Sequence, residues 1–361
     1  MNISTHARLA AVAIAGALAL AACGSDSGST SSPAASGSIN CVTGALKASG
    51  SSAQKNAMAE WVNAYQTACN GATINYQANG SGAGIKDFIN KQTQFAGSDS
   101  PLKDQDKTDA DARCAAGPAI DIPMVGGAIV LAYNISGVSK LTLTPDIIAG
   151  IYASTITKWN DPKIVAANAG VTLPDATIAQ FHRSDSSGTS DNFTKFLAAT
   201  APGTWTFGNA KDWKAPGGQG SKGSDGVASS VKATANSIGY MELSFAQDAK
   251  LSAAAVDNGA GAIDATSENA AKTISAATVK GTGNDLALSI DYKAAAGYPI
   301  VLVTYQITCE KGGDAATVPL VRAFLTYTAS DEGQGKLGPA GYVPITGDLL
   351  TKVRTAVAAI S

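Results

Sequence analysis

Three turns rich in glycine and serine constrain this chain most, because each joins a segment typical of a strand to a segment typical of a helix. The turns are 50–52 (GSS), 80–82 (GSG) and 187–189 (SGT). Strand-like and helix-like segments alternate along the rest of the chain, and this alternation predicts an α/β fold. The stretch 252–295 is poor in aromatic residues and fits neither pattern.

Two segments have the patterns of helices. In 51–71, the residues Ala57, Trp61 and Tyr65 recur on one face, and Ser51 with Gln54 has the spacing of a capping box at the helix start. The acidic stretch 104–113 (DQDKTDADAR) predicts a solvated helix face rather than a metal-binding loop.

Composition limits the class of protein. The chain has 361 residues, of which 45% are hydrophobic and 15% charged, so it is long enough for two globular domains. The formal net charge is −2 and no run of lysine or arginine occurs, so nucleic acid is not expected as a partner.

The N-terminus has the pattern of a bacterial lipoprotein. Arg8 precedes an apolar run over 9–22, and the sequence LAAC ends at Cys23. We predict a signal peptide over 1–22, a lipidated Cys23 carrying palmitate, and a flexible tether over 23–38. The protein is then expected outside the cytoplasm, anchored to the cell membrane by its lipid. The alternative is an ordinary signal peptide beside an unrelated cysteine.

Four cysteines remain once Cys23 is assigned to the lipid. An even number outside the cytoplasm predicts two disulfides, and three connectivities are possible. The spacings are too wide for a zinc pattern, so no metal and no cofactor are expected. The four candidates are Cys41, Cys69, Cys114 and Cys309.

The stretch FHRSDSSGTSDNF, residues 181–193, combines one arginine with many hydrogen-bond donors. The guanidinium of Arg183 matches the geometry of an oxyanion, and Asp185 is close enough in sequence to hold it in place. The following turn, 187–189, adds hydroxyl and backbone N–H donors at a helix start. Three such turns meeting at one cleft would surround an anion.

Catalytic and nucleotide-binding motifs are not supported. The stretch GSGAGI ends in Ile85, where a dinucleotide fingerprint needs glycine and a P-loop needs lysine. His182 is the one histidine outside the signal peptide, and no G-x-S-x-G elbow occurs. We therefore do not expect an enzyme, with a serine-dependent phosphatase as an alternative.

Several motifs together resemble one known family. They are NGSGAGIKDF, FAGSDSPL, GGAIVLAYNISGV, KWNDPKI, HRSDSSGTSDNF and SIGYMEL. As a set they resemble the phosphate-binding protein of the bacterial phosphate-specific ABC transporter, over nearly all of the chain after residue 39. The resemblance implies an α/β, two-lobed type II periplasmic binding protein fold, with mixed sheets flanked by helices and a ligand cleft between the lobes. Crossings near Gly126 and Gly297 would divide the chain into lobe I (39–126 and 297–361) and lobe II (127–296).

The resemblance also implies the residues that bind phosphate and one, Asp185, that braces the arginine. The first turn departs from the family, which often has threonine and phenylalanine where this chain has Ser52 and Ala53. The implied phosphate-binding residues are Ser51, Ser52, Ala53, Ser81, Asp99, Arg183, Ser187, Gly188 and Thr189.

The implied function is capture of inorganic phosphate outside the cytoplasm and delivery to the membrane permease subunits of a phosphate ABC transporter. A monomer is expected. Asp99 would accept a proton from phosphate and so reject sulfate, which has none to donate. The alternative ligand is another tetrahedral oxyanion.

Overall fold

The computed structural model describes residues 39–293 and 296–361. The predicted signal peptide, the lipidated Cys23 and the tether over 23–38 therefore lie outside the described residues. Within the described part of the chain, no helix has the length and hydrophobicity needed to cross a membrane.

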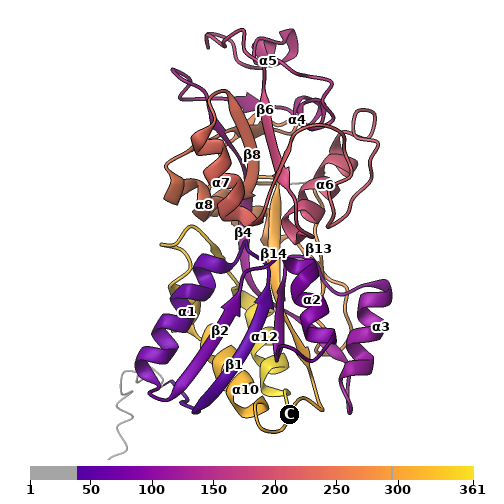
Figure 1. The fold of residues 1–361 in the computed structure, drawn as a ribbon, viewed down its shortest axis with the longest axis vertical. Helices are drawn as coiled ribbons and strands as arrows, with labels where there is room; N and C mark the ends of the chain where they lie inside the picture. The colour runs from indigo at the N-terminus through magenta and orange to yellow at the C-terminus, as the bar shows by residue number, and fades with distance from the viewer. Residues whose placement is uncertain (1–38, 294–295) are drawn as a thin grey trace, which may run out of the picture. The chain divides into compact units, whose positions relative to one another are not determined.

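Strand β4 (Ala119–Asn134) organises the fold by belonging to two halves of one mixed sheet. Its register runs against β14 as far as Ala128 and against β8 from Ile129 onward. Every residue of β4 except the last is buried, as expected for a strand that is covered on both faces. The two halves of the sheet form the cores of two lobes (Figure 1).

The first lobe contains strands in the order β2-β1-β3-β14-β4, with β15 paired to β4. Strands β1, β2 and β3 are mutually parallel, whereas β14 runs antiparallel to both β3 and β4. The strands are β1 (Gly44–Gly50), β2 (Ala72–Gln77), β3 (Phe95–Ser98), β14 (Val301–Cys309) and β15 (Val343–Pro344). The helices are α1 (Lys55–Ala68), α2 (Ser81–Ile89), α3 (Asp104–Arg113), α10 (Val318–Thr328), α11 (Asp331–Gly335) and α12 (Gly347–Ala358).

The second lobe continues the sheet in the order β4-β8-β6-β7, with β9 also paired to β4. Strand β6 is parallel to β7 and β8. The strands are β6 (Ala179–Arg183), β7 (Gln219–Ser221), β8 (Ser237–Glu242) and β9 (Ser252–Ala253). The helices are α4 (Pro145–Tyr152), α5 (Pro162–Ala167), α6 (Gly188–Thr200), α7 (Gly223–Ala233) and α8 (Leu243–Ala249).

The described part of 252–295, which fitted no helix or strand pattern, is divided between the two lobes. A small sheet of β5 (Thr142–Leu143), β10 (Ala255–Asp257) and β11 (Ala262–Ile263) belongs to the second lobe. Helix α9 (Ser267–Ser275) packs instead on β4, β14 and β15, and β12 (Thr278–Val279) pairs with β13 (Leu288–Ser289). This packing favours a second crossing of the chain, from the second lobe back to the first, just before α9 instead of near Gly297. The lobe boundaries remain a proposal.

The predicted capping box at the start of α1 is wrong. The helix begins at Lys55 with Gln54 as its N-cap, and no side chain caps it. The hydroxyl of Ser51 instead donates to Asp99, and the amide of Gln54 donates to Tyr76 Oη at 2.9 Å. The partner of Ser51 follows the end of β3 and the partner of Gln54 lies in β2, so tertiary contacts override the local motif.

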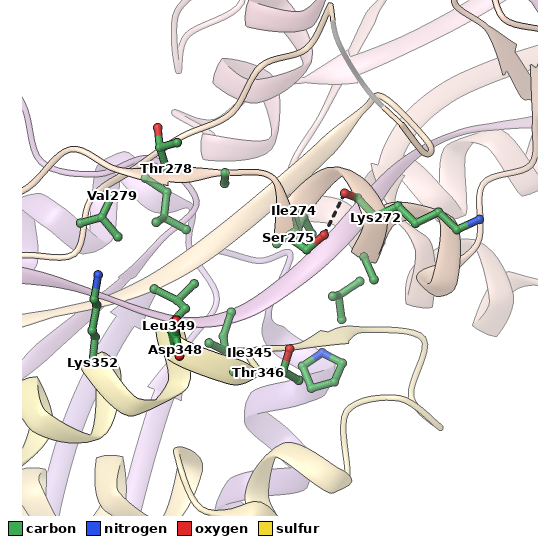
Figure 2. Close-up of a pocket in the computed structure, with 16 residues that line it drawn as sticks. Lys272, Ile274, Ser275, Thr278, Val279, Ile345, Thr346, Asp348, Leu349 and Lys352 are labelled. Atoms are coloured by element: carbon green, nitrogen blue, oxygen red, sulfur yellow. Dashed lines mark hydrogen bonds between the residues drawn. The ribbon is translucent and has the colours of Figure 1, made fainter.

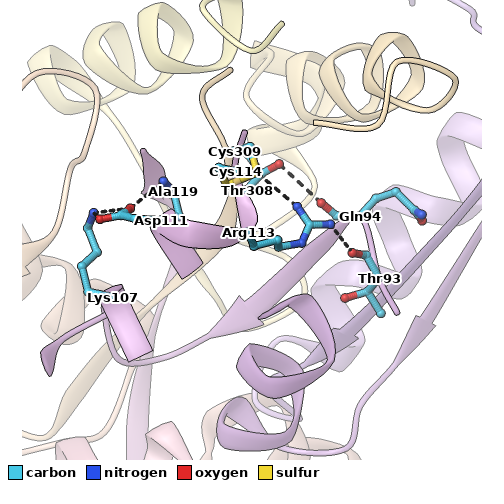
Figure 3. The surroundings of a disulfide bond; sticks show 9 residues. All are labelled: Thr93, Gln94, Lys107, Asp111, Arg113, Cys114, Ala119, Thr308 and Cys309. Atoms are coloured by element: carbon cyan, nitrogen blue, oxygen red, sulfur yellow. Dashed lines mark hydrogen bonds and ion pairs between the residues drawn. A yellow bond between two sulfur atoms is a disulfide. The ribbon is translucent and has the colours of Figure 1, made fainter. Parts of the chain in front are cut away.

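The prediction of two disulfides is confirmed, with one of the three possible connectivities: Cys41–Cys69 and Cys114–Cys309. The second bond joins the end of α3 to the end of β14 (Figure 3). Beside it, Arg113 Nη1 lies 3.1 Å from Cys309 Sγ and Nη2 donates to the carbonyl of Thr93 at 2.9 Å. The bond therefore fixes α3 to the sheet at a buried, hydrogen-bonded position.

A cavity of about 840 Å³ lies between α9, β12, β15 and the start of α12. Its lining is mostly apolar, with Lys272 and Lys352 among the polar side chains, and Figure 2 shows Ile274, Val279 and Leu349 around it. None of the predicted phosphate-binding residues lines this cavity.

The two disulfides predict a difference in stability. Replacing Cys114 and Cys309 by serine should lower the free energy of unfolding more than replacing Cys41 and Cys69. The sequence separations are 195 and 28, for which loop-closure entropy gives a difference of about 1.7 kcal/mol. Denaturant unfolding of the two double variants tests this, and equal losses would contradict the entropic account.

Candidate functional site

The turns that the sequence singled out meet at one edge of the sheet. Strands β1, β2 and β3 are parallel, so their carboxyl ends lie together, and the first two turns and Asp99 follow these ends. Strand β6 of the second lobe ends at Arg183, and the third turn leads from there into α6. The site is therefore formed by loops from both lobes.

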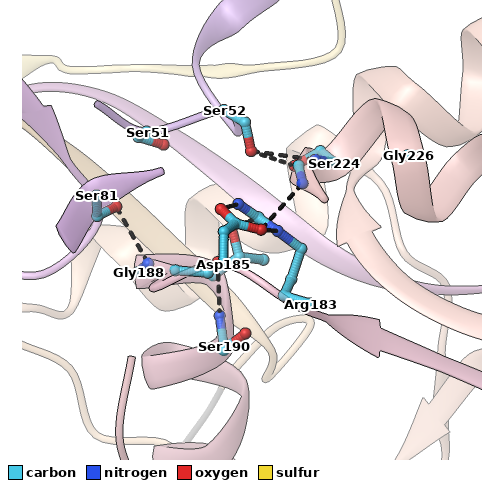
Figure 4. Close-up of polar contacts among 12 residues, drawn as sticks. Ser51, Ser52, Ser81, Arg183, Asp185, Gly188, Ser190, Ser224 and Gly226 are labelled. Carbon is cyan, nitrogen blue, oxygen red and sulfur yellow. Dashed lines mark hydrogen bonds and ion pairs between the residues drawn. The ribbon is translucent and has the colours of Figure 1, made fainter. Parts of the chain in front are cut away.

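The second and third turns are in direct contact. The backbone N–H of Gly188 donates to Ser81 Oγ at 3.1 Å (Figure 4). The N–H of Gly82 donates to the carbonyl of Ser186 at 2.9 Å. A side chain at Gly188 would place its Cβ only 2.6 Å from Asp99 Cβ. Glycine is needed at this position because the two lobes approach each other this closely.

The first turn contacts the second lobe at another point. Ser52 Oγ lies 3.2 Å from Ser224 Oγ and accepts the N–H of Ser224 at 3.0 Å, which Figure 4 shows. The N–H of Ala53 donates to Ser51 Oγ at 3.1 Å. Ser51, Ser52 and Ala53 are all buried.

Asp99 is the acceptor at the centre of the site, and its side chain is buried. Ser51 donates to Oδ1, Thr304 donates to Oδ1 at 2.8 Å, and Thr189 donates to Oδ2 at 3.2 Å. Burial raises the pKa of Asp99 above its ordinary value, and the hydrogen bonds of Ser51 and Thr304 and the charge of Arg183 oppose this rise.

Arg183 supplies the positive charge, and its side chain is 1% exposed. Its Nε donates to Asp185 Oδ1 at 2.7 Å, its Nη2 contacts Oδ2, and its Nη1 lies 3.4 Å from Thr189 Oγ1. Burial would raise the pKa of Asp185, but the hydrogen bonds and charge of Arg183 hold that pKa below its ordinary value. Asp185 thus stays ionised and holds the guanidinium in place.

Every residue predicted for the site lies in this cluster, although the role of Ser187 differs. Its hydroxyl accepts the N–H of Ser190 at 3.2 Å and so caps α6. Capping fixes the helix start that presents the N–H of Gly188 and the hydroxyl of Thr189. That these residues bind phosphate remains a prediction.

Sequence reasoning missed two residues. Ser224 follows Gly223 at the start of α7, so the same Gly/Ser signal between a strand and a helix could have found it. Gly223 also donates its N–H to Asp185 Oδ1 at 3.0 Å. Thr304 lies inside the buried strand β14, and no pattern distinguishes it there from its apolar neighbours.

The remaining expectations concern metals and catalysis. Among the described residues, no group of three or more histidine, cysteine, aspartate or glutamate side chains is arranged to hold a metal ion. The ring of His182 stacks on Trp213 with centroids 4.8 Å apart, and its Nδ1 lies 3.0 Å from the carbonyl of Arg183. These contacts do not place His182 as a base for a serine nucleophile.

The two lobes and the polar site between them are typical of a periplasmic binding protein. A family model described as the PBP superfamily domain matches residues 28–332. The phosphate-binding protein PstS 3 of Mycobacterium tuberculosis is 42% identical over the whole of both chains, and PstS 2 of the same organism is 43% identical over 96% of each. The chain therefore belongs to the PstS family of phosphate-binding proteins within the PBP superfamily.

Solved structures support the same fold. The phosphate-binding protein of Stenotrophomonas maltophilia superposes with a TM-score of 0.67. Its sequence is 21% identical, and the match covers 87% of this chain and 94% of that one. The prediction of a two-lobed periplasmic binding protein fold is thus confirmed.

The close approach of the two lobes at Gly188 predicts that a side chain at this position prevents them from closing. Gly188→Ala should keep the lobes apart, because its Cβ would overlap Asp99 and Ser81. Small-angle X-ray scattering is expected to give a larger radius of gyration for this variant than for the parent chain. Gly203→Ala is the matched control, since nothing lies within 4 Å of its added Cβ. Equal radii for Gly188→Ala and the parent would show that this approach does not limit closure.

Proposed function

We propose that this chain captures inorganic phosphate outside the cytoplasm and delivers it to the permease of a phosphate ABC transporter. One observation supports phosphate as the ligand. A buried carboxylate, Asp99, lies beside a buried arginine, Arg183, and among hydroxyl donors. Phosphate suits this combination because it both accepts hydrogen bonds and, near neutral pH, donates one. The names of the relatives support the same ligand.

The charges of the site favour a ligand that carries a proton. Arg183 is paired with Asp185, so the positive charge is already balanced, and Asp99 adds a negative charge. A fully ionised anion would meet repulsion from Asp99 without a hydrogen bond to offset it. Hydrogen phosphate would instead donate to Asp99. The hydroxyls of Ser51 and Thr189, which donate to Asp99 in this structure, would turn to its other oxygens, and Ser52 would add a further donor.

Closure of the two lobes would bury the ion, and opening at the permease would release it. The residues in this proposal come from both lobes, so the closed arrangement is what completes the site. The predicted lipid on Cys23 would hold the protein at the membrane beside the permease, and 23–38 would act as the tether. We also propose that the protein acts as a monomer.

Selectivity against sulfate should depend on the charge of Asp99. In Asp99→Asn the repulsion is removed and an amide donor is gained, so sulfate affinity should rise by at least about tenfold, the equivalent of one charge-assisted hydrogen bond. Calorimetric titration with sulfate and phosphate measures both affinities. Asp175→Asn, which removes an exposed carboxylate paired with Lys158, should behave as the parent. Unchanged sulfate affinity in Asp99→Asn would rule out the proton-accepting role.

The raised pKa of Asp99 predicts a pH dependence for the parent chain. Protonation neutralises Asp99, and because its pKa is raised this happens at a higher pH than for an exposed aspartate. Sulfate binding should therefore appear as the pH falls through this pKa and be absent at neutral pH. Asp99→Asn should bind sulfate without this dependence. The prediction fails if sulfate affinity of the parent is the same at neutral and acidic pH.

A further inference from the structure

Glu242 is a buried carboxyl at the boundary between the lobes, and the proposed binding step does not use it. It ends β8 and lies opposite Ile129, the first residue of β4 that pairs in the second lobe. Its side chain is fully buried. An added Cβ at Gly127 would lie 3.1 Å from Glu242 Cγ, so β4 faces this carboxyl with backbone alone.

Among the residues that the structure describes, Glu242 makes no ion pair. Oε2 accepts the N–H of Ser244 at 2.9 Å and contacts the hydroxyl of Ser244, whereas Oε1 has no hydrogen-bond partner in the described part of the chain. Tyr342, from the loop before β15, and Asp99 are the titratable groups of other elements that act on it. Helix α1 contributes the neutral Asn56, which also bonds Asp248 of α8.

Burial raises the pKa of Glu242 to about 8, with smaller and opposing effects from the hydrogen bonds of Ser244 and Tyr342 and a small increase from Asp99. A carboxyl in this environment therefore carries a proton near neutral pH. The unpaired oxygen and the absence of any ion pair to Glu242 among the described residues agree with a neutral group.

A chain of hydroxyl groups leads from Glu242 to the first turn of the site. Ser244 Oγ contacts Glu242 Oε2, lies 3.1 Å from Tyr342 Oη and accepts the amide of Asn56 at 3.0 Å. Tyr342 Oη in turn donates to the carbonyl of Ala53 at 2.6 Å. Ala53 belongs to the turn that carries Ser51 and Ser52.

Counting the hydroxyl protons shows why the protonation state of Glu242 matters to this series of hydrogen bonds. Ser244 and Tyr342 have one hydroxyl proton each. If Glu242 is ionised, the proton of Ser244 is directed to the carboxylate, and none is left for the contact with Tyr342. If Glu242 is protonated, it donates to Ser244, Ser244 donates to Tyr342, and Tyr342 donates to Ala53. Only the protonated carboxyl lets every contact be a hydrogen bond.

We propose that Glu242 is a positioning residue whose carboxyl proton orients Ser244 and Tyr342 and so fixes the first turn of the binding site in the closed protein. Glu242 and Ser244 belong to the second lobe, and Tyr342 and Ala53 to the first, so this series of hydrogen bonds forms only when the lobes are closed. This inference rests on the proposed function, because it concerns the same phosphate site.

The sign of the pH dependence follows from linkage. Opening breaks the contact between Ser244 and Tyr342 and admits water, so the pKa of Glu242 is higher in the closed protein than in the open one. Closure is favoured while Glu242 is protonated, and this contribution is lost as the pH rises from the open-state pKa through about 8. Within that window phosphate affinity falls by up to about tenfold per pH unit.

The test compares phosphate affinity of the full chain and of Glu242→Gln across this pH range. Glutamine is neutral at every pH, and its amide can donate to Ser244. The ratio of the two affinities cancels the ionisation of phosphate, which is the same for both proteins. We expect the parent and Glu242→Gln to agree at acidic pH and the parent to weaken progressively relative to the variant as the pH rises. Glu310→Gln, which removes a partly exposed carboxylate, should keep the parent's profile.

A second variant tests the link to the first turn. Tyr342→Phe removes the hydroxyl that reaches Ala53 and should weaken phosphate binding by about three- to tenfold, the equivalent of one hydrogen bond. Tyr65→Phe, whose hydroxyl donates to the carbonyl of Asn40, should bind as the parent.

The outcomes separate the two proposals. A parent that binds phosphate, with an affinity ratio to Glu242→Gln that is constant with pH, overturns the role of Glu242 alone. Tyr342→Phe with the parent's affinity overturns the hydroxyl chain to Ala53. A folded parent that does not bind phosphate overturns the proposed function and this inference together.

Discussion

The buried carboxylate of Asp99 is the group on which the closed arrangement depends. Removing a carboxylate from water is costly unless donors replace the lost solvent, and these donors come from separate elements of both lobes. Ser51 and Thr304 reach it from the first lobe, and Thr189 reaches it from the second. The network that solvates Asp99 therefore also joins the lobes, and a ligand that bonds to these groups acts directly on closure.

The charges around this network explain how a slightly acidic protein can bind an anion. Among the described residues, Arg183 is the one whose cationic side chain hydrogen-bonds to a site residue, and Asp185 balances its charge. Apart from Thr304 in β14, the remaining donors are hydroxyl and N–H groups at or just before the starts of helices, which provide partial charges at fixed positions. A rigid set of dipoles is more selective than a mobile positive charge, because each donor must find an acceptor in one place. This arrangement suits a small tetrahedral ion with one proton.

The sequence predicted the parts of the site that depend on local chemistry. Glycine at 188 and hydroxyl residues at 51, 81 and 189 stand between a strand and a helix, and parallel strands bring such turns to one edge. Thr304 could not be predicted, because its role comes from the neighbour that β14 finds in the folded sheet. The capping box failed for the same reason, since Ser51 bonds to Asp99 instead of its own helix. The disulfide connectivity and the place of α9 also depend on long-range packing that no local pattern records.

The most direct test of the account is calorimetric titration of the parent chain, freed of bound anion, with phosphate and with sulfate at neutral pH. Asp99 is expected to admit only an anion that can donate a proton, so we expect that one phosphate binds per chain and that sulfate gives no binding heat. Binding of both ions with similar affinity, or of neither by a folded chain, would contradict the claim that this carboxylate selects the ligand.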